Sequence, residues 1–150
     1  MVDTYSNFEE LAKAQEEGRD FRIRFRNLGS RIAIIAPHGG GIERGTSELA
    51  EALSADDLSF YAFEGLLPQD NYKLLHITST SFNEPKCLEL IKSTERVITI
   101  HGDGSPSNSV YVGGLDDEII VRIISSLRAR DFAAERHPDP EKHGKSHSNI

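Results

Sequence analysis

The chain has 150 residues, of which 37% are hydrophobic, and this size and composition are typical of one ordinary globular domain. Its 24 acidic and 17 basic residues give a formal charge of −7, which repels nucleic acid and anionic membrane surfaces. We therefore expect no nucleic-acid partner and no membrane partner, and we expect a monomer.

The amino-terminal sequence MVDTYSNFEELAKAQ lacks the basic start and the apolar run of a secretory signal, and no segment approaches the ~18 apolar residues of a membrane span. The single cysteine, Cys87, excludes an internal disulfide and is interpreted as a partly buried thiol. We expect a cytoplasmic protein that meets an extracellular substrate only after cell lysis.

The first third of the chain predicts helices and strands in alternation. A capping-box spacing at residues 6–9 predicts a helix over about 6–17. Apolar and charged residues alternate over 21–26, which is typical of a half-exposed edge strand. The apolar run 32–36 predicts a strand covered on both faces that stops at Pro37. A helix capped by a hydroxyl side chain is expected over about 46–53.

Similar patterns continue along the chain and define the fold class. Further strands are expected over 58–63, 73–78, 96–100 and 110–114, and further helices over about 85–93 and 117–127. This alternation predicts a three-layer α/β fold, with a mostly parallel or mixed central sheet and helices on both faces. We expect one α/β domain over 1–131 that carries the candidate zinc site. The polar segment 132–150, rich in proline and histidine, is expected to be an irregular or mobile tail.

Two of the buried strands end in a histidine followed by glycine, namely His38 and His101. Ligands bind at the carboxyl ends of the strands in open α/β sheets, so both side chains are expected to face one crevice. Glu43 follows three glycines, which allow the loop to fold back toward His38. Two histidines, one carboxylate and an open position for water form a recognised catalytic zinc set.

Other interpretations of these residues remain open. Each strand-end histidine can instead be a hydrogen-bonded surface residue, and the glycine-rich loop can bind phosphate, although it lacks the lysine of a P-loop. His76 either lines the crevice and binds substrate or is a structural histidine within a strand. Arg44 either pairs with an acidic group of the substrate or is simply exposed to solvent.

The segments IAIIAPHGGGIERGTSELA, YKLLHITSTSFNEPKCLEL, RVITIHG and VYVGGLDDE resemble the successive motifs of phage and Bacillus-type poly-γ-glutamate hydrolases, over essentially the whole chain. The resemblance implies a zinc-carboxypeptidase-like fold and a Zn2+ held by His38, Glu43 and His101. It also implies that a zinc-bound water cleaves γ-glutamyl amide bonds of poly-γ-glutamate or γ-glutamyl peptides.

The chain departs from the family pattern at its carboxyl end. In the family, a segment beginning Asn-Ile leads to an arginine and then to a strand with a glutamate, the counterpart of the carboxypeptidase general base. This sequence ends at Asn149-Ile150, so the general base is expected beyond Ile150 and no catalytic residue is assigned. The alternative hypotheses are a metal-containing binding domain without turnover and a metal-free structural or phosphate-binding module.

Overall fold

The computed structural model describes residues 3–146 and 149–150, and the chain divides into two compact units. The first unit comprises Met1–Asp103 together with Ile150, and the second comprises Gly104–Asn149. His147 and Ser148, which belong to the predicted tail, lie outside the described residues.

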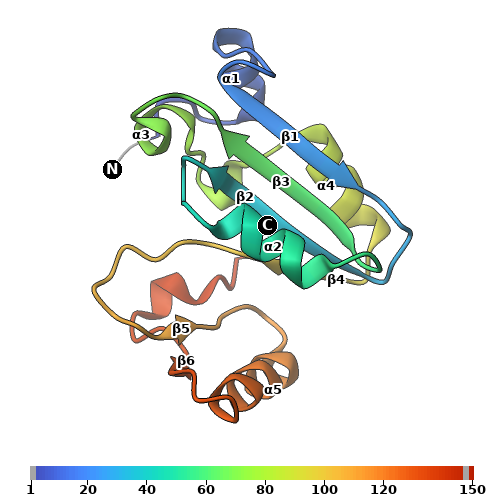
Figure 1. The fold of residues 1–150 in the computed structure, drawn as a ribbon, viewed down its shortest axis with the longest axis vertical. Coiled ribbons are helices and arrows are strands. Elements are labelled where there is room, and N and C mark those ends of the chain that lie inside the picture. Colours follow the sequence, from blue (N-terminus) through green and yellow to red (C-terminus); the bar gives the residue numbers. More distant parts are fainter. Residues whose placement is uncertain (1–2, 147–148) are drawn as a thin grey trace. The chain divides into compact units, whose positions relative to one another are not determined.

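A four-stranded mixed sheet forms the centre of the first unit (Figure 1). The strands β2 (Ile32–Gly40) and β3 (Ser59–Gly65) are parallel, as are β2 and β4 (Arg96–Thr99). The edge strand β1 (Phe21–Arg26) is antiparallel to β3. The predicted mixed sheet with an antiparallel edge strand is therefore confirmed. In spatial order, the strands are β1, β3, β2 and β4.

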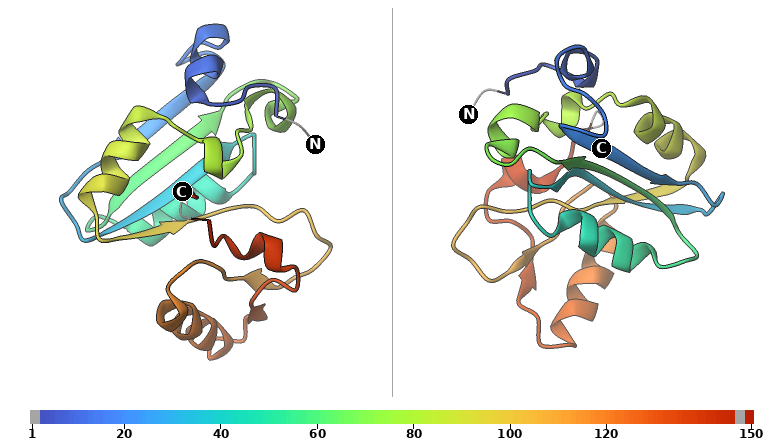
Figure 2. Two further views of the ribbon diagram at one scale, coloured as in Figure 1. Left: turned by 180° about the vertical axis from the view of Figure 1, so that it is seen from behind. Right: turned by 45° about the horizontal axis from the view of Figure 1, so that its top comes forward.

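Helices cover both faces of this sheet, with α2 (Thr46–Ser54) on one face and α1 (Phe8–Ala14) and α4 (Pro85–Ser93) on the other (Figure 2). Successive side chains of a strand point to opposite faces, so β2 and β3 contribute to two separate apolar clusters. The predicted arrangement of three layers is thus confirmed. The cluster under α2 contains Ile34, Ala36, Ala50, Phe60 and Ala62, and the opposite cluster includes Leu11, Ile35, Tyr61, Phe63, Cys87 and Leu90.

Capping side chains fix the starts of two helices in the first unit, whereas α2 begins after Gly45 without the hydroxyl cap that was predicted for it. The Glu84 side chain accepts a hydrogen bond of 2.8 Å from the Cys87 N–H, and Pro85 occupies the first turn, as expected for α4. In α1 the cap is Asn7, which accepts from the Glu10 N–H at 2.9 Å. The first helix therefore covers Phe8–Ala14, and the prediction of a helix over 6–17 was too long at both ends.

The predicted strand over 73–78 is wrong, because the helix α3 (Asn71–Leu75) occupies the first half of this segment and the remainder is not part of a sheet. The Asn71 side chain fixes the start of α3 by pairing with both the N–H and the carbonyl of Leu67, at 2.9 and 2.7 Å. A short apolar run fits a buried strand and a buried helix equally well, so its pattern alone did not decide between them. Extended residues then lead from α3 to the short 3-10 helix η1 (Ser79–Ser81).

The strand β2 continues to Gly40, although a stop was predicted at Pro37. Pairing with β3 shifts register between Ala36 and Gly39, where β2 contains one extra residue. Proline lacks an N–H and is tolerated at such a bulge, because the bulge already interrupts the ladder of hydrogen bonds. The bulge therefore lets the strand pass through Pro37 and redirects the side chain that follows it.

The second unit contains the helix α5 (Asp117–Arg128) and a two-stranded parallel sheet of β5 (Val110–Tyr111) and β6 (Ala134–Glu135). Asp116 caps α5 by accepting from the Ile119 N–H at 3.1 Å, and the helix matches the one predicted over about 117–127. The strand β6 and the 3-10 helix η2 (Pro140–His143) fall within 132–150, the segment predicted to be irregular or mobile. None of the helices in the described part of the chain is both long and apolar enough to traverse a membrane.

Candidate metal centre

His38 lies in the bulge of β2 and its side chain is almost completely buried. Its Nε2 atom lies 2.8 Å from the carbonyl oxygen of Ile77. A carbonyl oxygen can only accept, so Nε2 carries the proton and Nδ1 presents a free lone pair. A metal-binding imidazole is held in the same way, with one nitrogen donating to a carbonyl and the other directed at the ion.

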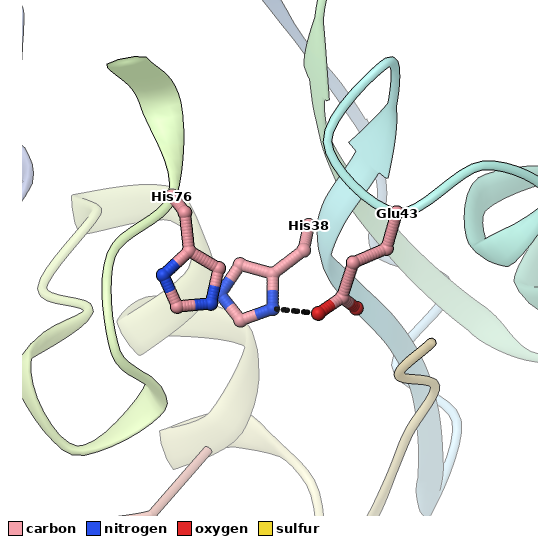
Figure 3. A group of neighbouring side chains, drawn as sticks. All are labelled: His38, Glu43 and His76. Carbon is pink, nitrogen blue, oxygen red and sulfur yellow. Dashed lines mark ion pairs between the residues drawn. The ribbon is translucent and has the colours of Figure 1, made fainter. Parts of the chain in front are cut away.

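The loop after β2 brings the Glu43 carboxylate back to His38 (Figure 3). Gly40 has φ +61°, and a Cβ at this position would lie only 2.6 Å from the Gly65 carbonyl oxygen, so the turn requires glycine. The Glu43 N–H closes the loop by donating to the His38 carbonyl at 2.8 Å. As a result, Oε1 of Glu43 lies 3.5 Å from Nδ1 of His38.

The Glu43 carboxyl group is held in its ionised form. Burial raises its pKa, but the neighbouring His101 and His38 rings and the hydrogen bond from the Gly102 N–H, 2.8 Å from Oε2, outweigh the burial. The pKa of Glu43 therefore lies well below its usual range. This side chain supplies a negative charge next to the free lone pair of His38.

His101 follows β4, the strand beside β2, and completes the group of donors. Its Nδ1 atom lies 3.2 Å from Nδ1 of His38 and 3.7 Å from Oε2 of Glu43. A tetrahedral zinc site with bonds of roughly 2.0–2.1 Å has ligand atoms about 3.3 Å apart. The two Nδ1 atoms are separated by a similar distance, and each lies near one oxygen of the Glu43 carboxylate, so the group fits one ion. The His101 side chain is 37% exposed, which leaves one side of the group open to solvent.

His76 lies beside the same group, and one ligand atom each of His38, Glu43 and His76 lie within 4.8 Å of one another (Figure 3). Its ring stacks on that of His38, with centroids 4.2 Å apart and an angle of 30° between the planes. The lone pairs of an imidazole lie in the plane of its ring, so stacked rings direct them side by side and not toward one point. The set with His101 therefore suits a single ion better than the set with His76.

Asp3 holds His76 from the other side. Its Oδ1 atom lies 2.7 Å from Nδ1 of His76, and its Oδ2 atom accepts from the N–H and the hydroxyl of Thr78 at 2.6 and 2.7 Å. Burial raises the pKa of Asp3, but the hydrogen bonds from His76 and Thr78 lower it by a larger amount. The pKa of Asp3 therefore lies below its usual value. Because Asp3 accepts the proton of Nδ1, the other nitrogen of His76 has a free lone pair.

The structure thus brings together all of the residues that sequence reasoning singled out as ligands. It places His76, predicted as a substrate-binding residue, directly against His38. Arg44, the other predicted substrate-binding residue, is exposed, and its side chain forms no ion pair with another described residue. Asp3 was missed because it lies 73 residues before His76 in the sequence, and no local pattern connects the two.

Comparison with known proteins agrees with this geometry. The sequence model of the family described as poly-gamma-glutamate hydrolase matches residues 5–150. In Bacillus subtilis (strain 168), the SPbeta prophage-derived UPF0714 protein YoqZ is 47% identical over 135 residues and the UPF0714 protein YndL is 42% identical over 132 residues. These alignments cover 89% and 88% of this chain but 48% and 51% of the relatives, so the chain spans about half the length of the curated relatives it matches.

Two solved structures share the fold. One is described as the structure of bacteriophage poly-gamma-glutamate hydrolase, with 33% identity and a TM-score of 0.93. The other is described as YNDL-apo (Zinc-free), with 38% identity and a TM-score of 0.92. Each comparison covers 99% of this chain and 72% of the other. The resemblance expected from the sequence motifs is confirmed, and the chain belongs to the poly-gamma-glutamate hydrolase family.

Proposed function

We propose that this chain binds one zinc ion through His38, Glu43 and His101 and serves a hydrolase that cleaves γ-glutamyl amide bonds of poly-γ-glutamate. The observation that carries the proposal is the convergence of two imidazole nitrogens and one carboxylate group. The two Nδ1 atoms lie 3.2 Å apart, and Oε1 and Oε2 of Glu43 lie 3.5 and 3.7 Å from Nδ1 of His38 and of His101, respectively. Membership of the family supports the hydrolase, and the relative described as zinc-free supports the choice of metal.

The chemistry of the donors suits a divalent ion and an anionic substrate. When bound at such a set, zinc supplies a Lewis acid and a water molecule of lowered pKa. The protein holds His38 in the required tautomer through the Ile77 carbonyl, and it holds Glu43 through the Gly102 N–H. Two neutral imidazoles and one carboxylate carry a charge of −1, so the loaded site is a net cation. This local charge draws a polyanion despite the −7 of the whole chain.

Arg44 provides a second positive group for the substrate. Each residue of poly-γ-glutamate carries a free α-carboxylate, and a guanidinium group can bind a carboxylate through two parallel hydrogen bonds. Arg44 follows the ligand Glu43 directly, is exposed, and has no competing ion pair among the described residues. We assign it to an α-carboxylate beside the scissile bond, with His76 bordering the same site.

A second candidate function is a zinc-containing domain that binds the polymer without turnover. Glu43 contacts both imidazoles of the centre, and Asp3 contacts the neighbouring His76. Glu43 is assigned as a ligand, and both oxygens of Asp3 already accept hydrogen bonds. Neither carboxylate is placed to act as a general base, and this observation favours binding without efficient hydrolysis.

Metal analysis combined with a turnover assay tests both candidates. We expect one zinc per purified chain at saturating metal, lost in His101→Ala and retained in His76→Ala. The opposite pattern in the two variants would favour the ligand set with His76. Release of oligomers from poly-γ-glutamate supports the hydrolase, whereas polymer binding without release supports the binding domain. Absence of stoichiometric zinc from the wild-type chain would refute both.

A further inference from the structure

The segment His76–Ser79 contacts both imidazoles of the proposed zinc centre. The Ile77 carbonyl accepts from Nε2 of His38 at 2.8 Å, and the His76 ring stacks on the face of the same imidazole. The Ser79 hydroxyl lies 3.5 Å from Nε2 of His101. One short segment therefore reaches the distal nitrogen of each histidine that directs its Nδ1 atom toward the centre.

Asp3 anchors this segment from outside. Its two carboxylate oxygens receive three hydrogen bonds, one from His76 and two from Thr78, all between 2.6 and 2.7 Å. The anchored residues lie on either side of Ile77, whose carbonyl is the partner of His38. Hydrogen bonds to an ionised carboxylate are shorter and stronger than those between neutral groups. Loss of Asp3 would therefore release His76 and Thr78, the two residues that flank Ile77. The Ile77 carbonyl, which accepts the hydrogen bond from His38, would then be less restrained.

We propose that Asp3 is a positioning residue for the zinc centre and acts through the segment His76–Ser79. The inference rests on the ligand set of the proposed function. Partners of the distal nitrogen fix the tautomer and the orientation of a ligating imidazole, and their loss weakens metal binding. Asp3 contributes by restricting the carbonyl and the stacked ring that restrain His38.

Asp3→Asn tests the proposal, because asparagine offers a single acceptor oxygen. Its oxygen can accept from Thr78, but its amide group can only donate to Nδ1 of His76, which requires the other tautomer of that ring. The variant therefore cannot reproduce the charge-assisted hydrogen bonds that Asp3 accepts at both ends of the segment. We expect the zinc dissociation constant, measured by competition with a chromophoric chelator, to rise about tenfold. The matched control is Thr4→Val, which removes the neighbouring hydrogen bond of 2.7 Å from the Thr4 hydroxyl to the Lys73 carbonyl. This control should bind zinc as the wild type does.

A second measurement reports the geometry without metal. Nitrogen-15 NMR of the metal-free protein should show His38 protonated at Nε2 in the wild type and a mixture of tautomers in Asp3→Asn. Thr78→Val, which keeps two of the three hydrogen bonds to Asp3, provides a milder variant if Asp3→Asn does not fold, and a smaller loss of zinc affinity is expected.

The outcomes separate this inference from the proposed function. Folded variants that bind zinc as tightly as the wild type and keep the His38 tautomer would overturn the role of Asp3, even if their melting temperatures fall. If the wild type itself binds no zinc, the proposed function fails, and the tautomer measurement alone decides the inference. An unchanged tautomer in Asp3→Asn, or in Thr78→Val where the first variant does not fold, would then overturn it.

Discussion

Replacement of Glu43 by glutamine separates the negative charge of this side chain from its hydrogen bonding. Glutamine keeps an oxygen that can accept from the Gly102 N–H, which lies 2.8 Å from Oε2, but it loses the charge that the folded state stabilises. The metal-free variant should therefore unfold at a lower temperature than the metal-free wild type. The anionic donor beside both imidazoles is lost. We expect the zinc dissociation constant to rise at least about 100-fold, which corresponds to about 2.7 kcal/mol.

Thermal unfolding with and without zinc measures this difference. At a free zinc concentration 100-fold above the wild-type dissociation constant, binding stabilises the wild type by about 2.7 kcal/mol and a variant with 100-fold weaker affinity by about 0.4 kcal/mol. In a chain of this length 1 kcal/mol shifts Tm by roughly 2–4 °C, so zinc should raise Tm by roughly 5–11 °C in the wild type and roughly 1–2 °C in Glu43→Gln.

The control for this experiment is Glu95→Gln, which removes an exposed carboxylate paired with Arg31 at 2.6 Å. It makes the same chemical change in the first unit without touching the donor group, and it should keep the full zinc-induced shift in Tm. A wild-type shift in Glu43→Gln would refute the assignment of Glu43 as a ligand. A lost shift in Glu95→Gln would show that the effect is not specific to the site.

Two further predictions concern acid stability and substrate binding. A hydrogen bond from Arg19, followed by one from the Glu16 N–H, lowers the pKa of Asp20 from 3.8 to about 2, so the folded state gains stability above the unfolded pKa and loses it as the pH falls toward 2. The Tm deficit of Asp20→Asn at neutral pH should therefore shrink between pH 3.8 and about 2, and a deficit independent of pH would contradict this reasoning. Arg44→Ala should weaken binding of poly-γ-glutamate by up to about fivefold in calorimetry at low salt, because an exposed ion pair contributes about 1 kcal/mol or less. Equal affinities of Arg44→Ala and the wild type would argue against contact with the substrate.

Elements with local signals were predicted well from the sequence. The helix α4 has a capping carboxylate and a proline in its first turn, and both act within four residues of each other. The buried part of β2 was evident from its continuous apolar run. A strand that is covered on both faces has apolar side chains on both, so its sequence does not alternate between apolar and polar residues. The segment 73–78 lacked such a signal, and contacts of Asn71 with Leu67 made its first part helical.

The candidate ligands were predictable as residue types at strand ends, because parallel neighbouring strands direct their carboxyl ends to one edge of a sheet. The choice between His76 and His101 as the third donor was not decided by spacing alone. It depends on ring orientation: His76 stacks on His38, whereas Nδ1 of His101 faces Nδ1 of His38 at 3.2 Å.

The sequence by itself determined the α/β class, the order of most elements and the positions of two histidines and a glutamate, since these follow from local periodicity and from the amino acids present. Only the tertiary structure decided the bulge that redirects His38, the return of Glu43 to within 3.5 Å of it, and the anchoring of His76 and Thr78 by Asp3. The physical reason is the range of the interactions. Caps and apolar periods act over a few residues, whereas the hydrogen bonds of the candidate centre join groups 39 to 75 positions apart, which only packing of the whole unit brings together.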